Sequence, residues 1–172
     1  MTADRVRLAI LRPEDEADII AANVASREYH TPWAAPCLDP TGFAAWLETA
    51  GKPNHRTLIA RRTGDGTIAG VINFSQIALG NFRSAYLGYH GNTACSGEGL
   101  MTEAVRQAVD FAFLDIGLHR IEANIQPGNL RSIALVRRVG FRHEGFSPRY
   151  LMIDGDWRDH ERWALTQEDW QK

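Results

Sequence analysis

The stretch Ser96-Gly97-Glu98-Gly99-Leu100-Met101-Thr102 joins a predicted strand to a predicted helix, and it decides how the chain is interpreted. Two glycines one residue apart let a backbone approach a ligand closely. The helix that follows begins with unpaired N–H groups at the positive end of its dipole, which is typical of an anion-binding loop. A Gly-x-Gly sequence before a helix also fits a plain tight turn.

Two familiar phosphate-binding motifs are missing from the sequence. There is no G-x-x-x-x-G-K-[ST] motif, so a P-loop that hydrolyses nucleotides is not supported. There is also no G-x-G-x-x-G motif in a first β-α-β unit, which argues against a dinucleotide-binding fold.

The segment after the loop has the periodicity of an amphipathic helix. Polar and charged residues fill the positions between its apolar ones, and Gly117 is expected to end it. The apolar residues, at i, i+3, i+4, i+7 and i+11, are Met101, Ala104, Val105, Ala108 and Ala112.

The remaining patterns predict strands and further helices in the order βαα-βββ-α-β-α-ββ. One helix is expected to begin at Pro13, and two others are expected at Thr41–Ala50 and Asn129–Val139. The strands are Arg5–Leu11, Thr57–Arg62, Thr67–Ile77, Arg83–Tyr89, His119–Gln126 and a pair joined by a hairpin turn at Asp154-Gly155. This order predicts an α/β (α+β) fold in which about four helices flank a mixed, mostly antiparallel sheet of about seven strands.

Composition narrows the class of protein further. The 172 residues are 44% hydrophobic and 23% charged, which fits a single domain over residues 1–172. The net charge of −2 produces no overall positive field that would attract nucleic acid or anionic membranes. We expect a cytoplasmic protein, because the sequence has neither a signal peptide nor a long apolar run. Its 2 cysteines form no disulfide framework, and no metal site is expected.

Five runs, in order, resemble the GNAT acetyltransferases, and more narrowly the RimJ/RimL-type ribosomal-protein N-acetyltransferases, with the RimJ branch most similar. The resemblance extends from roughly Thr57 to Trp170. The runs are Gly70–Ser75, Ala85–Tyr89, Gly97–Ala104, Asn129–Ser132 with Gly140-Phe141, and Tyr150–His160.

The resemblance implies a GNAT fold with acetyl-CoA as co-substrate. The diphosphate of the cofactor is expected on the loop that starts the helix, its arm beside the strand after Tyr86, and further contacts from Asn129 and Ser132. Asn129 fits a helix N-cap equally well, and the two roles are compatible. The implied cofactor-binding residues are Leu87, Tyr89, Gly97, Glu98, Gly99, Leu100, Met101, Thr102, Asn129 and Ser132.

Three positions depart from the family's usual pattern. Ser96 stands where the family usually has Gln or Arg, and Glu98 where it often has Lys. A carboxylate at Glu98 opposes diphosphate binding, so a lysine there is expected to improve affinity about fivefold. Val136 occupies the position of a general-acid tyrosine, which leaves Ser132 as the expected proton donor. Tyr86 is the second catalytic candidate, although a phenol is a poor base, and no general base is identified.

The resemblance implies transfer of an acetyl group to an amine, most simply the N-terminal α-amine of a ribosomal protein, in a ternary complex. Two alternatives stay open: an acetyltransferase for small amines, and a degenerate acyl-CoA-binding or regulatory module. The expected partners are a protein N-terminus or small amine, and a second copy of the chain in a homodimer.

Overall fold

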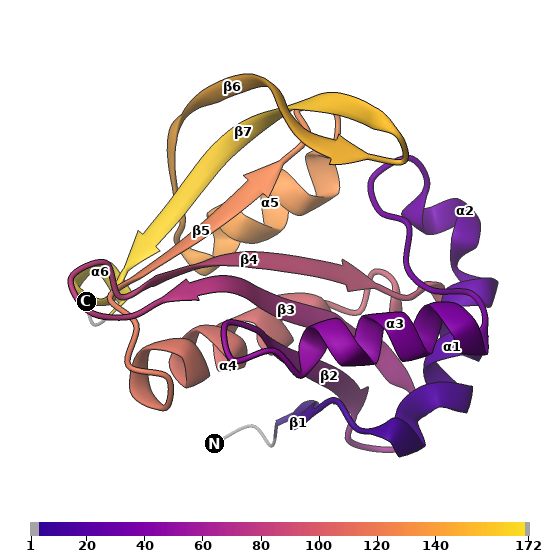
Figure 1. Ribbon diagram of the computed structural model, residues 1–172. Helices are drawn as coiled ribbons and strands as arrows, with labels where there is room; N and C mark the ends of the chain where they lie inside the picture. Colours follow the sequence, from indigo (N-terminus) through magenta and orange to yellow (C-terminus); the bar gives the residue numbers. More distant parts are fainter. Residues whose placement is uncertain (1–3, 171–172) are drawn as a thin grey trace.

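A seven-stranded sheet forms the centre of the computed structural model, which describes residues 4–170 (Figure 1). Its spatial order is β1-β2-β3-β4-β5-β7-β6, and every neighbouring pair is antiparallel except β4 and β5. The mixed, mostly antiparallel sheet expected from the sequence is therefore confirmed. The strands are β1 (Val6–Ile10), β2 (Arg56–Arg62), β3 (Ile68–Ala78), β4 (Ser84–Gly91), β5 (Arg120–Ile125), β6 (Arg142–Ile153) and β7 (Asp156–Thr166).

The helices include all the predicted ones and two short additions of 4 residues each. A 3-10 turn at Pro13–Asp15 leads into the first helix, as the proline and its acidic neighbours predict. The helices are α1 (Glu16–Ala25), α2 (Arg27–His30), α3 (Pro40–Ala50), α4 (Leu100–Leu114), α5 (Leu130–Val139) and α6 (Gln167–Trp170). Among residues 4–170, no helix is long and apolar enough to cross a membrane.

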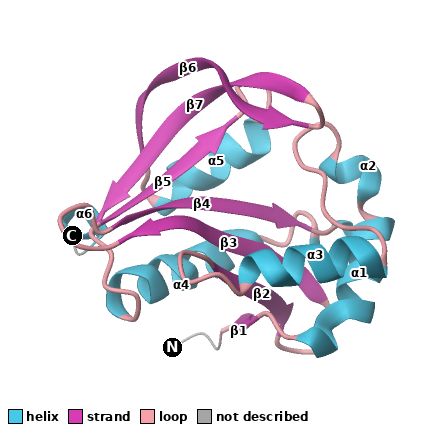
Figure 2. Cartoon of the chain, in the orientation of Figure 1, coloured by secondary structure: helices cyan, strands magenta, loops and turns pink. Residues whose placement is uncertain are grey.

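Helices cover both faces of the sheet, and a separate apolar core lies under each layer (Figure 2). The larger core packs the apolar face of α4, together with α5, against strands β1 to β5 and β7. The smaller one packs α1 and α3 against β2 and β3. Ala104, Val105, Ala108 and Ala112 are all fully buried, which confirms the periodicity of α4. The helix ends at Leu114, three residues before the expected Gly117.

The sheet opens between its two parallel strands. The pairing of β4 with β5 covers only Ser84 to Tyr86 against Arg120 to Glu122, and the two strands then diverge (Figure 1). Beyond Tyr86, the edge of β4 that faces β5 therefore has no strand partner there. This opening positions the site.

Candidate active site

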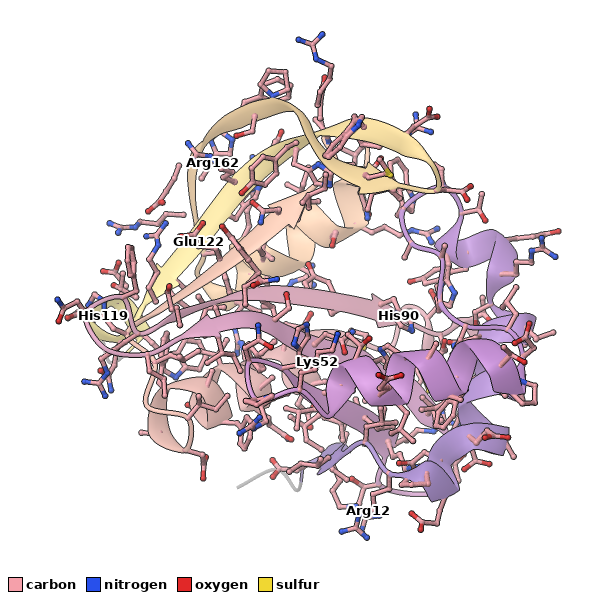
Figure 3. The ribbon with its side chains drawn as sticks, viewed as in Figure 1. Arg12, Lys52, His90, His119, Glu122 and Arg162 are labelled. Carbon is pink, nitrogen blue, oxygen red and sulfur yellow. The ribbon has the colours of Figure 1, made fainter. Side chains whose placement is uncertain are left out.

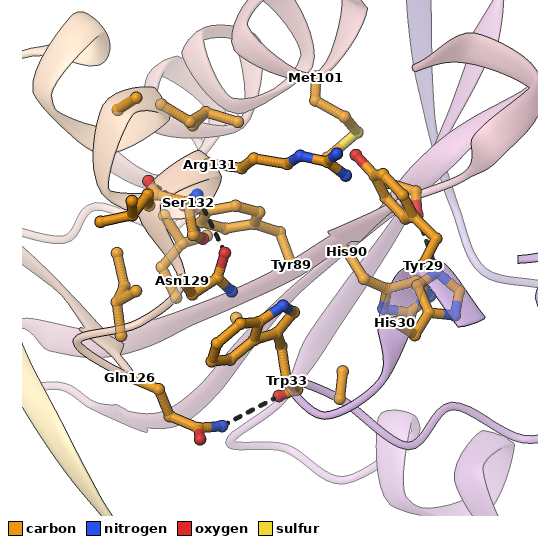
Figure 4. A pocket seen from close by; sticks show the side chains of 18 of the residues that line it. Tyr29, His30, Trp33, Tyr89, His90, Met101, Gln126, Asn129, Arg131 and Ser132 are labelled. Carbon is orange, nitrogen blue, oxygen red and sulfur yellow. Dashed lines mark hydrogen bonds between the residues drawn. The ribbon is translucent and has the colours of Figure 1, made fainter. Parts of the chain in front are cut away.

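A cavity of about 1010 Å³ occupies the opening between β4 and β5. The N-terminal ends of α4 and α5, the diverging parts of β4 and β5, the β6–β7 hairpin and the segment from Tyr29 to Ala34 form its walls (Figure 4). Of the sequence-predicted residues, eight line it: Leu87, Tyr89, Gly97, Gly99, Met101, Thr102, Asn129 and Ser132. Glu98, Leu100 and Tyr86 do not.

The loop before α4 presents unpaired backbone donors. Gly97 and Gly99 have φ values of +82° and +78°, a conformation that favours glycine. Among the described residues, the N–H groups from Gly97 to Met101 have no hydrogen-bond acceptor, whereas that of Thr102 donates to the Gly99 carbonyl over 3.1 Å. Because these donors lie at the positive end of a 15-residue helix, the loop can hold an anionic group.

The side chain of Glu98 is held away from the cavity. Its carboxylate oxygens accept hydrogen bonds from Arg62 over 2.9 and 3.2 Å, and its carbonyl accepts one from Arg5 over 3.0 Å. The carboxylate that was expected to oppose the diphosphate is therefore already paired with Arg62, and its effect on cofactor binding stays a prediction. Leu100 is buried in the core, so only its backbone is available to the loop.

A positively charged side chain, Arg138, lies where α4 and α5 meet. Arg138 donates to the Thr102 hydroxyl over 3.2 Å, and both residues line the cavity. Nearer the other end, the Arg131 guanidinium lies 5.0 Å from the ring centre of Tyr29 (Figure 4). The positive charges of the cavity thus come from α5.

Two hydroxyl groups meet where β4 faces the first turn of α5. The Ser132 hydroxyl donates to the Tyr89 phenol oxygen over 2.7 Å, and the phenol donates to the Ser132 carbonyl over 3.1 Å. Burial raises the pKa of Tyr89, so the phenol stays protonated at neutral pH. The Asn129 side chain accepts from the Ser132 N–H over 3.2 Å, which confirms its role as the N-cap of α5.

Tyr86, the second catalytic candidate, lies outside the lining of the cavity. Its neighbours Ala85 and Leu87 are buried in the core, and alternation along the strand directs Tyr86 to the opposite face. A hydrogen bond with Tyr150, together with burial, raises the pKa of Tyr86 to about 12, so the phenol is protonated at neutral pH. On the same face, Glu122 is paired with Arg120 over 2.8 Å (Figure 3).

No aspartate or glutamate is among the described residues that line the cavity. Its polar groups are instead neutral amides and hydroxyls, histidines, and the arginines of α5. Burial, with His30 adding to it, lowers the pKa of His90 to about 3, which keeps that ring uncharged. Within residues 4–170, no group of three or more potential metal ligands is found.

The segment after α2 closes one side of the cavity. Trp33 packs so closely on Gly128 that a Cβ there would lie 3.0 Å from its ring, and its carbonyl accepts from Gln126 over 3.5 Å (Figure 4). His30 anchors the segment through a 2.8 Å hydrogen bond between Nε2 and the Gly91 carbonyl. The sequence reveals this segment only as an aromatic loop without period.

The sheet opens between its two parallel strands, and a loop that can hold an anionic group lies at the opening, as expected for the GNAT acyltransferase fold that the sequence resembles. The family model described as an acetyltransferase (GNAT) domain matches residues 5–142, and the chain belongs to the GNAT acetyltransferase family.

Ribosomal-protein N-acetyltransferases are among its most similar relatives. The "[Ribosomal protein uS5]-alanine N-acetyltransferase" of Escherichia coli (strain K12) is 36% identical over 179 residues, covering 99% of this chain and 92% of the relative. The structure of Mycobacterium smegmatis RimJ in complex with CoA-disulfide matches with a TM-score of 0.87 and 30% identity, covering 97% of this chain and 84% of that one. The ribosomal-protein-S5-alanine acetyltransferase from Vibrio fischeri shares the fold, with a TM-score of 0.84, 24% identity and coverage of 100% and 98%.

GNAT enzymes use acetyl-CoA, and the cavity fits that molecule. The free N–H groups from Gly97 to Met101 suit a diphosphate, and the unpaired edge of β4 beyond Tyr86 suits an extended amide-containing arm. A Cβ added at Gly97 would meet nothing within 4 Å, so the loop is open to a ligand on that side.

Proposed function

We propose that this acetyltransferase modifies the N-terminal α-amine of a protein, and of a ribosomal protein in particular. The observation that carries the proposal is the absence of any aspartate or glutamate from the described lining of the cavity. A polyamine carries several ammonium groups, and burying them without carboxylate partners is costly. A peptide N-terminus presents a single amine followed by an uncharged backbone.

The same observation bears on the proton that the amine must lose before it attacks. An α-amine has a pKa near 8, more than two units below that of a lysine side chain. A neutral cavity without carboxylates therefore suits an α-amine better than a lysine or polyamine nitrogen. The E. coli relative, an alanine N-acetyltransferase of ribosomal protein uS5, agrees with this acceptor class. A cytoplasmic location is part of the proposal.

The mechanism assigns roles to residues around the cavity. Acetyl-CoA would supply an acetyl group activated as a thioester. The N–H groups from Gly97 to Met101 would bind its diphosphate, and the β4 backbone near Leu87 to Tyr89 would bind its arm and polarise the carbonyl. The Ser132–Tyr89 hydroxyl pair would donate the proton that the leaving sulfur requires.

A panel of acceptors tests the proposal. The enzyme is incubated with acetyl-CoA and a peptide that has a free N-terminal alanine, the same peptide with a blocked N-terminus and a free lysine, spermidine, or free amino acids. Thiol release gives the rate, and mass spectrometry locates the acetyl group. We expect turnover with the first peptide alone. Acetylation of the lysine or of spermidine at an equal or higher rate would overturn the proposal.

A further inference from the structure

His160 presents an unused proton acceptor to the cavity. It lies on β7, is only 3% exposed, and lines the cavity wall. Its Nδ1 atom lies 2.9 Å from the Arg158 carbonyl oxygen. Because a carbonyl only accepts hydrogen bonds, Nδ1 carries the proton of the neutral ring, and Nε2 keeps a free lone pair.

The Nε2 atom of His160 is also not completely buried. Among residues 4–170 it has no hydrogen-bond partner, and it is not sealed from solvent, whereas Nδ1 of His30 and Nε2 of His90 are buried without partners. The other nitrogen of His30 is occupied, because it bonds to the Gly91 carbonyl over 2.8 Å. Of these three cavity histidines, His160 alone has a known tautomer with an accessible acceptor.

Within the described residues 4–170, no acid pairs with His160 to form a catalytic dyad. The neighbouring Asp159 points away, and its carboxylate accepts from the Arg149 N–H over 2.7 Å. On β6, the ring of Tyr150 contacts His160 edge-on, with centres 6.1 Å apart. The group that orients the imidazole is therefore the Arg158 carbonyl and not a carboxylate.

Few other groups at this end of the cavity can titrate. His90 on β4 stays uncharged because its pKa is lowered to about 3. β5 contributes the neutral amide of Asn124, and Gln126, directly after the strand, contributes another. The remaining titratable groups of the lining are Tyr29 and His30 on α2, Tyr89 on β4, Cys95 before α4, and Arg131 and Arg138 on α5. Along its own strand, the charged residues nearest to His160 are Arg158, Asp159, Glu161 and Arg162.

We propose that His160 is the general base of the reaction and takes its proton from the acceptor amine. This inference rests on the proposed function for the kind of acceptor. Nε2 takes one proton from the acceptor's ammonium group, which leaves a neutral amine with a free electron pair. That pair forms the N–C bond to the acetyl carbon while the C–S bond breaks, and the sulfur takes the departing electrons and a proton from the Ser132–Tyr89 pair. The second proton of the original ammonium group and the proton held on Nε2 both leave to solvent, and the Ser132–Tyr89 pair regains one proton from solvent, so the cycle releases one net proton.

The pH dependence of His160→Asn separates this role from a structural one. Asparagine can keep a donor near the position of Nδ1, and with it the hydrogen bond to the Arg158 carbonyl, but it has no atom at Nε2. Without a base, kcat/KM follows the neutral fraction of the amine, whose pKa lies near 8. We therefore expect kcat/KM of His160→Asn to be about 10- to 100-fold below that of the wild type at pH 6.5. This ratio should shrink by about tenfold per pH unit up to the pKa of the amine.

Two further variants complete the experiment, and His160→Gln replaces the asparagine variant if that one does not fold. The exposed His143 is the matched control, and His143→Asn should keep the wild-type profile. His30→Gln tests the rival base. A deficit in His160→Asn that is constant with pH, the absence of a deficit, or a pH-dependent deficit in His30→Gln instead would overturn the proposal. Wild-type turnover with the acceptor panel is measured separately, so a wrong acceptor class is not mistaken for a wrong base.

Discussion

The Ser132 hydroxyl on α5 donates a 2.7 Å hydrogen bond to the Tyr89 phenol oxygen on β4. The phenol in turn donates to the Ser132 carbonyl, so the two side chains form a closed pair beside the N-terminus of α5. Val136, where the family resemblance implies a general-acid tyrosine, is fully buried. Tyr89 thus brings a phenol to α5 from strand β4.

Replacing Ser132 should affect turnover more than cofactor binding. A proton donor acts in the transition state, so Ser132→Ala should lower kcat by about 100-fold. The Ser132 backbone carbonyl still holds Tyr89 in this variant, and the affinity for CoA should stay within about twofold. Steady-state kinetics and titration calorimetry measure the two quantities. An equal loss in both would reduce Ser132 to a binding contact.

Combining this change with Tyr89→Phe tests whether the two hydroxyls act as one unit. The single variant Tyr89→Phe removes both hydrogen bonds of the pair and should also lower kcat by about 100-fold. Because residues that act together are strongly non-additive, the double variant should be slower than the slower single variant by no more than about threefold. Multiplied single effects in the double variant would mean that the hydroxyls act independently.

The N-cap of α5 should contribute measurably to stability. Asn129→Ala leaves the Ser132 N–H without its acceptor and should cost about 1 kcal/mol of unfolding free energy, or about 2–4 °C in Tm. Asn129→Asp keeps an acceptor at the cap and is the matched control. Thermal unfolding of both variants without CoA makes the comparison, and an unchanged Tm for Asn129→Ala would contradict the capping role.

Features set by local chemistry could be predicted from the sequence. Asp154 and Gly155 both have positive φ, +51° and +81°, as a two-residue hairpin turn between β6 and β7 requires. The apolar period of α4 predicted its buried face in the same way. The short helix α2 was missed, because 4 residues are too few to show a period.

Contacts between distant segments could not be predicted in this way. Tyr89 and Ser132 are 43 positions apart, and Arg62 and Glu98 are 36 apart, so no local pattern links them. Tyr89 was expected to contribute backbone contacts, yet its hydroxyl reaches Ser132. The lack of acids in the cavity is likewise a property of the assembled walls, since the chain as a whole contains 21 aspartates and glutamates.

Stability at acidic pH should depend on His90. Its pKa falls from an ordinary value of 6.5 to about 3 on folding, so between these values the unfolded chain binds a proton that the folded one does not. Stability is therefore lost as the pH falls through this window, by at most about 1.4 kcal/mol per pH unit. Urea unfolding at pH 7, 6 and 5 should show a smaller decline for His90→Asn than for the wild type. His143→Asn, on the exposed β6 strand, should keep the wild-type decline, and a full decline in His90→Asn would contradict the assignment.

Lysine at position 98 should not improve CoA binding, although the sequence alone predicts an improvement. The Glu98 carboxylate is paired with Arg62, so its charge is already compensated, and Glu98 does not line the cavity. Glu98→Lys would set a third positive charge beside Arg62 and Arg5 and leave Arg62 without this partner. We expect the Kd for CoA to change by less than about twofold at 0.05 M salt, because exposed ion pairs contribute little.

Removing Arg62 instead should expose the unfavourable effect of Glu98. In Arg62→Gln the carboxylate is free to turn toward the loop, and the Kd for CoA should rise about fivefold at 0.05 M salt. Adding Glu98→Lys to that variant should restore the affinity, whereas in the wild type the same lysine does not. Both effects should weaken at 0.5 M salt, where the Debye length is only about 4 Å. Calorimetric titration with CoA compares the wild type, Glu98→Lys, Arg62→Gln and the double variant at the two salt concentrations. A fivefold lower Kd for Glu98→Lys alone would mean that Glu98 acts on the phosphates directly and that its ion pair with Arg62 does not keep it away from them.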